Sequence, residues 1–381
     1  MKRSLVSIAT QQFVNMRVKW VITFISLSAC VDKINFNIPM TQSLIVVEGT
    51  INDNPGPYTV KLSKSISLDA DSAFRDPIEK AIIKLYDDGG NEEDLTEISP
   101  GIYLTGGAIQ GKIGHGYYIH ITTASGETYQ SDPDTINPVG EVQQIKYQFE
   151  AKTVTTNYGE AQADVFNVFV DADAGQGVNN YVRWRYTGTY KVETHPELHQ
   201  TFAGGYWYQT PVPCSGYIVA PALGGGKLTE VAPCACCTCW VSQYESAPTL
   251  SDEQLVVNHQ FRNVKVGEVP VNSNTFTDKF IVEVEQMSLT QNSFTFFNLI
   301  RAQKQGASSL FQPPSGKIIG NIKTINSSSQ VVGIFWATSV KSKFITINRS
   351  DVPYPITPPD FIRDACTIFP NSATIQPSFW Q

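Results

Sequence analysis

The chain has 381 residues and a formal net charge of −7 at pH 7, and only 17% of its residues are charged. A nucleic-acid surface needs clustered Lys and Arg, and adhesion to an anionic membrane needs a basic patch, so the composition favours neither. Sixteen Tyr, twenty Phe and dispersed Gly and Pro point to strands and turns rather than to helices.

The first element along the chain is a predicted signal peptide at residues 1–29. Arg17 and Lys19 form a basic start, a short apolar run follows, and the segment ends in small residues before a cysteine at Leu27–Cys30. The apolar run has about half the roughly 20 residues that a membrane-spanning helix needs, so we expect the peptide to be removed. The basic start also makes Met16 the expected start codon.

The sequence Leu-Ser-Ala-Cys at Leu27–Cys30 resembles the bacterial lipobox, in which the cysteine thiol receives a diacylglycerol and becomes residue one. Lipidation of Cys30 would attach a soluble body to the membrane, because two or three acyl chains give stable anchoring. Val31 stands where the inner-membrane retention rule requires aspartate, which favours the outer membrane. We expect the body to face the cell surface rather than the periplasm, although Asp32 and Lys33 match surface-export signals poorly.

Residues 30–41 are the predicted lipidated tether, and residues 42–138 are the predicted N-terminal domain. Its strand-forming runs are separated by turns rich in Gly, Pro and Asp, and the last run alternates apolar and polar residues. The predicted strands are Leu44–Gly49, Tyr58–Leu62, Ala81–Tyr86, Gly101–Leu104 and Tyr117–Thr123. Short strands at this spacing predict a β-sandwich of the immunoglobulin-like or transthyretin-like kind.

Residues 139–381 are predicted to form a larger β-rich domain with one short helix. Ser288 or Thr290 can cap a helix that places Phe294, Phe297 and Ile300 on one face. The predicted strands are Val142–Phe149, Val165–Val170, Tyr181–Tyr186, Asp278–Gln286, Lys317–Ile322, Val331–Ala337 and Lys343–Ile347. A Pro-rich tail from residue 353 is expected to wrap the surface.

An insertion from Thr187 to about Pro248 interrupts the strand pattern with Gly, Pro, aromatic residues and cysteines. Loops of this length in a compact domain are usually functional or fastened down. Tyr206, Trp207 and Tyr208 are the candidate binding residues, because aromatic side chains in a loop can stack on sugars or enter a partner's pocket. The alternative is that they cover the core of the second domain.

Removal of Cys30 from the count leaves six cysteines, and an exported protein favours disulfides among them. They are Cys214, Cys234, Cys236, Cys237, Cys239 and Cys366. In an extended chain the adjacent Cys236 and Cys237 point to opposite faces, so we expect long-range links to Cys214 and Cys366 instead. A zinc site made of four thiolates and a partly reduced cluster remain alternatives, although the cysteine spacing is not typical of zinc sites.

Several stretches together resemble the Bacteroidota lipoprotein family DUF4249. They are Val46–Ile51 with Pro55–Val60, Cys237–Trp240, Ser309–Phe311 with Gly316–Ile322, and Gly333–Lys343 with its Ser339 and Val340. The resemblance implies an outer-membrane lipoprotein whose gene often neighbours those of TonB-dependent transporters, and hence a transporter-associated or surface-complex role. It implies no catalytic residues, and the cysteine cluster is denser here than expected of the family.

Other motifs do not support catalysis or metal binding. His195 and His199 have helical spacing, but Pro196 stands where a zinc protease needs Glu, so surface histidines are favoured over a metal site. Asp171 and Asp173 begin like a calcium loop that lacks its final Glu, which favours a turn. We therefore predict no cofactor and no metal.

Two functional hypotheses from different classes follow. The first is a non-enzymatic binding or accessory subunit of an outer-membrane transporter or surface complex, held by its N-terminal lipid. The second is a hydrolase acting on glycans or peptides, whose two facing carboxylates would lie about 5 to 10 Å apart in a cleft. A structural or adhesive surface module is a third possibility, and the sequence identifies no ligand.

Overall fold

The computed structural model describes residues 44–65, 76–175, 181–222, 225–251, 256–306, 318–327, 329–357 and 361–381. All described residues belong to one compact unit, Ser43–Gln381. The predicted signal peptide, Cys30 and the tether at 30–41 lie outside the described residues. Within the described ranges, no helix combines the length and the apolar character that crossing a membrane requires.

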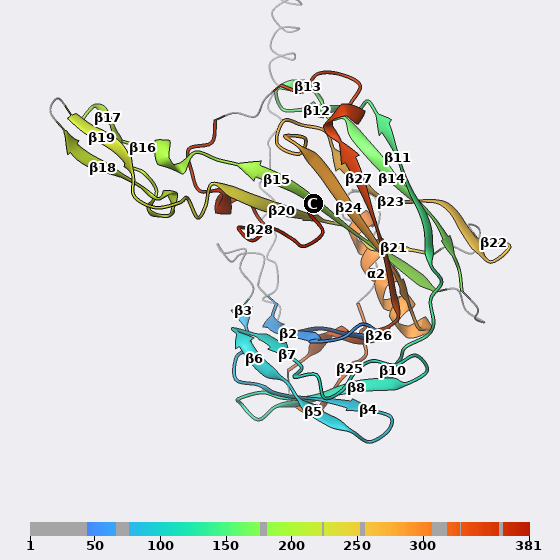
Figure 1. Cartoon of the computed structure of the whole chain (residues 1–381). Coiled ribbons are helices and arrows are strands. Elements are labelled where there is room, and N and C mark those ends of the chain that lie inside the picture. The colour runs from blue at the N-terminus through green and yellow to red at the C-terminus, as the bar shows by residue number, and fades with distance from the viewer. Residues whose placement is uncertain are drawn as a thin grey trace, which may run out of the picture. The chain divides into compact units, whose positions relative to one another are not determined.

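The described chain is mainly β, with antiparallel sheets and one long helix, as the composition predicts (Figure 1). The first part is a sandwich of two sheets. One sheet has the order β26-β1-β2-β7-β6, with β3 beside β2, and the other has the order β25-β9-β8-β4-β5, with β10 beside β8. The strands of this sandwich are β1 (Ile45–Asn52), β2 (Thr59–Lys64), β3 (Asp76–Pro77), β4 (Ile82–Asp87), β5 (Glu92–Asp94), β6 (Thr96–Ser99), β7 (Ile102–Leu104), β8 (Gly116–Thr122), β9 (Thr128–Ser131), β10 (Asp134–Thr135), β25 (Ile322–Asn326) and β26 (Val331–Thr338).

Alternation along the strands builds the core of this sandwich. In β8 every second residue is buried, so that Ile119 and Ile121 face inward while His120 points outward. Val47 and Ile51 of β1 meet them from the opposite sheet, within one cluster of buried residues. Each such side chain contributes about 1.5–3 kcal/mol when fully buried. The two facing sheets therefore hold each other by apolar packing.

The second part also consists of two sheets packed face to face. One has the order β11-β14-β23-β22 and the other the order β27-β24-β15-β20-β28, with β21 beside β15. Their buried residues form a single cluster that includes Trp184, Phe261 and Phe280. The strands are β11 (Val142–Glu150), β14 (Val165–Asp173), β15 (Val182–Glu193), β20 (Thr238–Tyr244), β21 (Thr249–Leu250), β22 (Val256–Val257), β23 (Gln260–Pro270), β24 (Lys279–Ser288), β27 (Val340–Asn348) and β28 (Ser372–Ala373), and a separate hairpin joins β12 (Thr153–Thr156) to β13 (Gly159–Gln162).

Two strands late in the chain belong to the first sandwich. β26 pairs in parallel with β1, from Ile45 opposite Val331 to Asn52 opposite Thr338, and β25 pairs with β9. After Ser339 the chain continues as β27, which pairs with β24 in the second part. β25 and β26 thus come after the predicted boundary near residue 138 in the sequence but belong to the first sandwich.

Two carboxylates, Asp53 and Asp134, hold this crossing together with hydrogen bonds. Asp53, in the turn after β1, accepts hydrogen bonds from the Ser339 hydroxyl at 2.6 Å and from the Val340 N–H at 2.8 Å. Asp134, which is 5% exposed, accepts from Thr290 Oγ1 at 2.6 Å, Ser293 Oγ at 2.7 Å and the Ala337 N–H at 3.0 Å. Hydrogen bonds to two carboxylates therefore link the two sandwiches. Hydrogen bonds to a charged acceptor are stronger than those between neutral groups.

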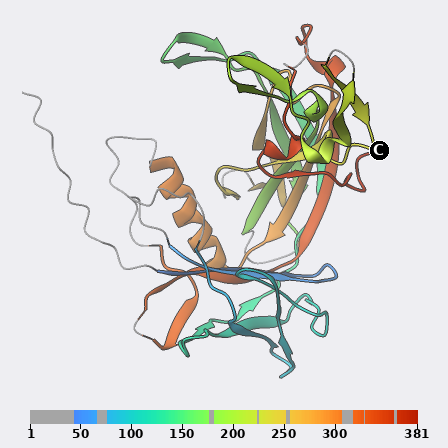
Figure 2. The same cartoon turned by 90° about the vertical axis from the view of Figure 1, so that its left-hand side faces the viewer.

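The helix α2 (Gln291–Gly306) begins at Thr290, one of the two predicted caps. Thr290 Oγ1 accepts from the Ser293 N–H, and Asp134 lies at the same end, where a negative charge suits the helix dipole. Phe297 packs in a third cluster with Trp336, and the predicted helix face is the packed one. Figure 2 shows α2 as the coiled ribbon beside the first sandwich.

The structure contains strands that were not predicted, among them β9, β20 and β23, and one predicted strand begins later than expected. The predicted strand Lys317–Ile322 begins only at Ile322, because residues 318–321 are not in a ladder. The strand β23 was not predicted, although it is one of the longest. Its ladder with β14 carries two register shifts, and Asn263 has a φ of 52°, so its buried residues do not alternate regularly. A bulged strand has no simple period-two signal.

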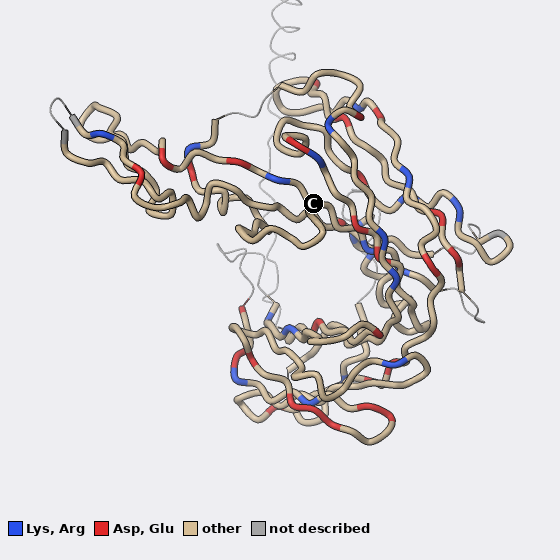
Figure 3. The backbone as a smooth tube through the Cα atoms, viewed as in Figure 1, with Lys and Arg blue, Asp and Glu red and all other residues tan. Residues whose placement is uncertain are grey.

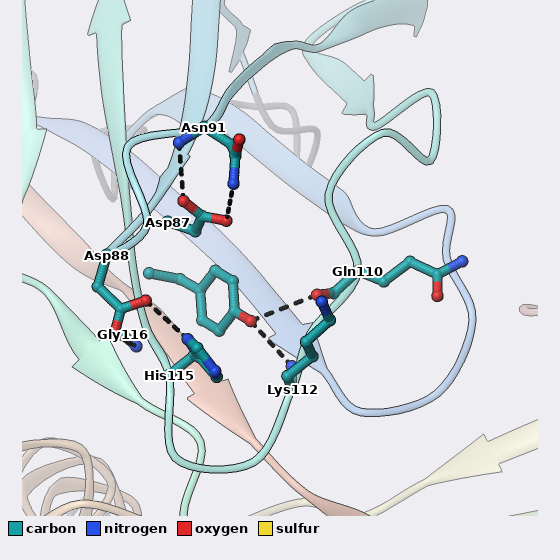
Figure 4. A network of polar contacts seen from close by, with 8 residues as sticks. Asp87, Asp88, Asn91, Gln110, Lys112, His115 and Gly116 are labelled. Carbon is teal, nitrogen blue, oxygen red and sulfur yellow. Dashed lines mark hydrogen bonds and ion pairs between the residues drawn. The ribbon is translucent and has the colours of Figure 1, made fainter.

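A polar network closes one end of the first sandwich (Figure 4). The Asp88 carboxylate accepts from the Gly116 N–H at 3.0 Å and lies 2.8 Å from the His115 ring. Both contacts favour the charged carboxylate and lower the pKa of Asp88. Asp87 binds the side chain and the N–H of Asn91 in the same turn. His115 is thus part of a loop contact.

We predict that Asp134→Ala lowers the free energy of unfolding by about 3 kcal/mol, because it removes the acceptor of the buried Ser293 hydroxyl and Ala337 N–H and of the half-buried Thr290 hydroxyl. Urea denaturation followed by circular dichroism measures the change. The matched control is Asp132→Ala, which removes a carboxylate that is 40% exposed and paired with Lys323, and should cost less than about 1 kcal/mol. Equal losses in the two variants would contradict the role given to Asp134.

A second prediction concerns Glu283. Its burial and the nearby Glu285 raise its pKa from an ordinary value of 4.5 to about 7. Between these values the unfolded chain loses the Glu283 proton and the folded chain keeps it, so the free energy of unfolding falls as the pH rises and levels off above pH 7. We expect Glu283→Gln to stabilise the protein at pH 8 by roughly 1 kcal/mol, after allowance for solvent screening, and hardly at all at pH 4. Thermal unfolding at both pH values tests this.

The control is Glu285→Gln. Glu285 lies opposite Arg185 in the β15–β24 ladder, and its Oε2 is 2.5 Å from Arg185 Nε. Loss of this pair should lower the unfolding temperature at pH 8, opposite in sign to Glu283→Gln. A destabilised Glu283→Gln variant at pH 8 would contradict the predicted burial effect.

Candidate binding arm

The candidate site lies on an arm formed by the connection between β15 and β20. The long insertion predicted from Thr187 is shorter in the structure, because β15 continues to Glu193 and β20 starts at Thr238. Figure 1 shows the arm extending away from these two strands. The arm contains η1 (Pro196–Leu198), β16 (Gln200–Ala203), β17 (Tyr206–Gln209), η2 (Pro213–Ser215), β18 (Tyr217–Ala222) and β19 (Gly225–Glu230).

Three disulfides lie between the arm and the sheet. The structure pairs Cys214 with Cys236, Cys234 with Cys237, and Cys239 with Cys366. The expected long-range links to Cys214 and Cys366 are present, and the adjacent Cys236 and Cys237 do not pair. With all six sulfur atoms in disulfides, no set of four thiolates is left for the alternative zinc cage. The local link between Cys234 and Cys237 was not among the expected ones.

The disulfides join the arm, the sheet and the tail. Cys239 is in β20 and is fully buried, and Cys366 begins the short helix η5 (Cys366–Ile368) in the Pro-rich tail. Further along the tail, β28 pairs with β20. The tail therefore lies beside the base of the arm, as expected of a segment held by Cys366.

The predicted binding aromatics are on the surface of this arm. Tyr206 is 70% exposed, Trp207 67% and Tyr208 52%. This exposure rules out the alternative that they cover the core of the second domain. Phe202, on the neighbouring strand, is 57% exposed and was missed, although it precedes the same Gly-Gly turn.

The four aromatic side chains occupy both faces of one hairpin. β16 and β17 pair antiparallel, with Phe202 opposite Trp207 and Thr201 opposite Tyr208. Phe202 and Trp207 therefore share one face, where their ring centroids lie 5.2 Å apart, while Tyr206 and Tyr208 share the other. A two-stranded hairpin with no core of its own is only marginally stable in water. Contact with a partner would bury rings on either face.

Charge is also absent from this part of the sequence. From Gln200 to Gly226 the chain contains no Asp, Glu, Lys, Arg or His. Figure 3 shows most of the arm's hairpins without charged residues. Depletion of charge together with enrichment in aromatic residues is the compositional signature of the centre of a protein–protein interface. The arm therefore has the character of a contact surface.

The two histidines of the arm's base have structural contacts. The His195 ring stacks on Phe361 of the tail, with centroids 4.0 Å apart, and its Nδ1 lies 3.0 Å from Glu197 Oε1. His199 Nδ1 lies 3.0 Å from the carbonyl oxygen of Thr210. In the described ranges no group of three or more His, Cys, Asp or Glu is placed to hold a metal ion.

Asp171 and Asp173, which begin like a calcium loop in the sequence, form contacts within the protein. Asp171 in β14 binds Lys146 at 2.8 Å, and Asp173 accepts from the Gly175 N–H at 2.8 Å. Burial raises the pKa of the Asp171 carboxyl, but hydrogen bonds from Lys146 and the Asn263 N–H outweigh this effect, so the pKa is lowered. These contacts are those of a strand and the turn that follows it.

Comparison with known proteins places the chain in a family. The family described as a domain of unknown function, DUF4249, matches residues 31–344. The chain belongs to the DUF4249 family. Neither the curated proteins nor the solved structures contain a match to it.

We predict unequal effects of the disulfides on stability. In the loop-entropy account, a link across 127 residues stabilises by about 5 kcal/mol and a link across 3 residues by about 2 kcal/mol. Cys239→Ser with Cys366→Ser should therefore lower the unfolding temperature far more than Cys234→Ser with Cys237→Ser. Thermal unfolding of both double variants tests this, and a larger loss from the local pair would contradict it.

Proposed function

We propose that this DUF4249 protein is a lipid-anchored, non-enzymatic outer-membrane protein that binds a TonB-dependent transporter or another surface complex. The lipobox-like sequence at Leu27–Cys30 supports the lipid anchor. Val31 after the cysteine supports the outer membrane over the inner one. The disulfides support export, because such bonds persist in oxidising compartments and are rare in the cytosol.

The observation that carries the binding role is the exposed aromatic hairpin. Its rings are more than half in solvent, it bears no charge, and disulfides fasten the base of its arm. Tyr and Trp provide a large contact area while only two side-chain torsions have to be ordered on binding. Such residues dominate binding energy at interfaces. A fastened base also lowers the entropy lost when the arm docks.

The test is affinity purification of the tagged full chain from its native outer membrane after gentle solubilisation. We expect the wild type to recover a large β-barrel protein. Trp207→Ala should lose at least nine-tenths of that partner, since removal of a central aromatic residue commonly costs 2 kcal/mol or more, or about 30-fold in affinity. Cys30→Ser should leave the membrane fraction.

The matched control is Tyr158→Ala, because Tyr158 is a fully exposed aromatic residue beside the turn of another hairpin, β12–β13. This variant should recover the partner as the wild type does. Recovery of the wild-type monomer alone across several detergents would refute the accessory role. Retention of Cys30→Ser in the membrane, still labelled with lipid, would refute the anchor.

A further inference from the structure

A second surface, separate from the arm, is a cleft of about 970 Å³. Three parts of the fold line it: the outer face of β1, β2 and β26, the helix α2, and the start of β15 with residues 245–248. This volume is at the upper end of the range for small-molecule sites, which are about 300–1,000 Å³. The cleft is therefore large enough for a ligand of twenty or so atoms with water beside it.

The floor of the cleft is apolar where a solvent-facing sheet would be polar. In β1 and β26 the residues Val47 and Phe335 face the sandwich core. Their neighbours Val46, Ile334 and Trp336 point to the other face and line the cleft. The helix covers part of this face with Phe297, and the rest lies against the cleft. The apolar part of a ligand could therefore be buried against this floor.

The charged residues of the cleft are mainly basic. It is lined by four cationic side chains and two carboxylates, in a chain whose net charge is −7. They are Lys61, Arg183, Arg185 and Lys304, with Glu48 and Glu245. A positive wall on a negative protein favours an anionic ligand.

Arg183 is the cation best placed to select the charge of a ligand. Its guanidinium lies 4.4 Å from the centroid of the Phe297 ring and also faces Trp336, and its Nη2 pairs with Glu245. Its buried Nε has no hydrogen-bond partner among the described residues. A guanidinium has five N–H donors, so this pairing leaves donors unused. In an apolar surrounding such donors interact strongly with an anion.

We propose that the cleft is a binding site for an amphipathic anion, with the apolar body on the β1–β26 face and a carboxylate-like head at Arg183. The inference is independent of the arm and of the lipid anchor. It concerns a small ligand rather than a protein partner, so failure of either proposal leaves the other standing.

The experiment is calorimetric titration of the full-length chain carrying Cys30→Ser, purified without detergent, with dodecanoate as the probe. We expect saturable binding of one dodecanoate per chain. Dodecyltrimethylammonium, with the same tail and the opposite charge, should bind at least tenfold more weakly, and acetate should not bind. Equal binding of the two twelve-carbon probes would overturn the charge selection, and absence of dodecanoate binding would overturn the site.

Two matched variants place the binding in the cleft. Ile300 is half-buried on α2 and lines the cleft, so Ile300→Glu puts a carboxylate beside the apolar body and should weaken dodecanoate binding at least tenfold. Ile325 is 59% exposed on β25 outside the cleft lining, and Ile325→Glu should leave binding unchanged. Equal affinities of the two variants would overturn the assignment to this cleft.

The contribution of Arg183 is tested with a variant that does not leave the Glu245 carboxylate unpaired. The double variant Arg183→Gln with Glu245→Gln removes both charges of the pair, which avoids the large cost of an unpaired buried carboxylate. We expect it to bind dodecanoate at least tenfold more weakly and to lose the preference over the cationic probe. If the preference persists in a folded double variant, Arg183 is not the head-group site.

Discussion

The fold depends on one continuous segment that contributes a strand to each of the two sandwiches. Residues 331–348 pass through the first sandwich as β26 and, after Ser339, through the second as β27. Because these two strands are joined through Ser339, neither can leave its sheet without disturbing the other. At this corner the Asp53 carboxylate accepts hydrogen bonds from the Ser339 hydroxyl and the Val340 N–H, and these bonds hold the change of sheet in place.

The cleft is a consequence of this crossing. Because β26 lies beside β1, its outward residues Ile334 and Trp336 form an apolar strip next to β15 of the second sandwich. The helix follows β24 and, through Asp134, is anchored at the same crossing. The walls of the cleft thus come from segments that are distant in sequence and that β26 and β27 bring together.

The arm follows a different physical rule. It has no core cluster among the described buried residues, and its hairpins are held at their base by disulfides rather than by packing. Aromatic side chains can therefore remain in solvent on both faces of β16–β17 without being drawn into a core. The protein combines a packed pair of sandwiches with a projecting contact surface.

The sequence by itself determined the β class, most strands with regular alternation, the helix start at Thr290 and the candidate aromatics, because these signals are local. The DUF4249 resemblance was confirmed by the match over residues 31–344. Regular periodicity could not reveal β23, whose bulges break the alternation, nor Phe202 as a partner of Trp207.

Only the tertiary structure decided which faces are exposed and which distant segments meet. The parallel pairing of β1 with β26 joins residues almost 290 positions apart, and no local pattern specifies such a partner. The same holds for Arg183 beside Phe297 and Trp336. Local chemistry selects the elements, while long-range packing selects their neighbours and so creates the cleft and leaves the arm in solvent.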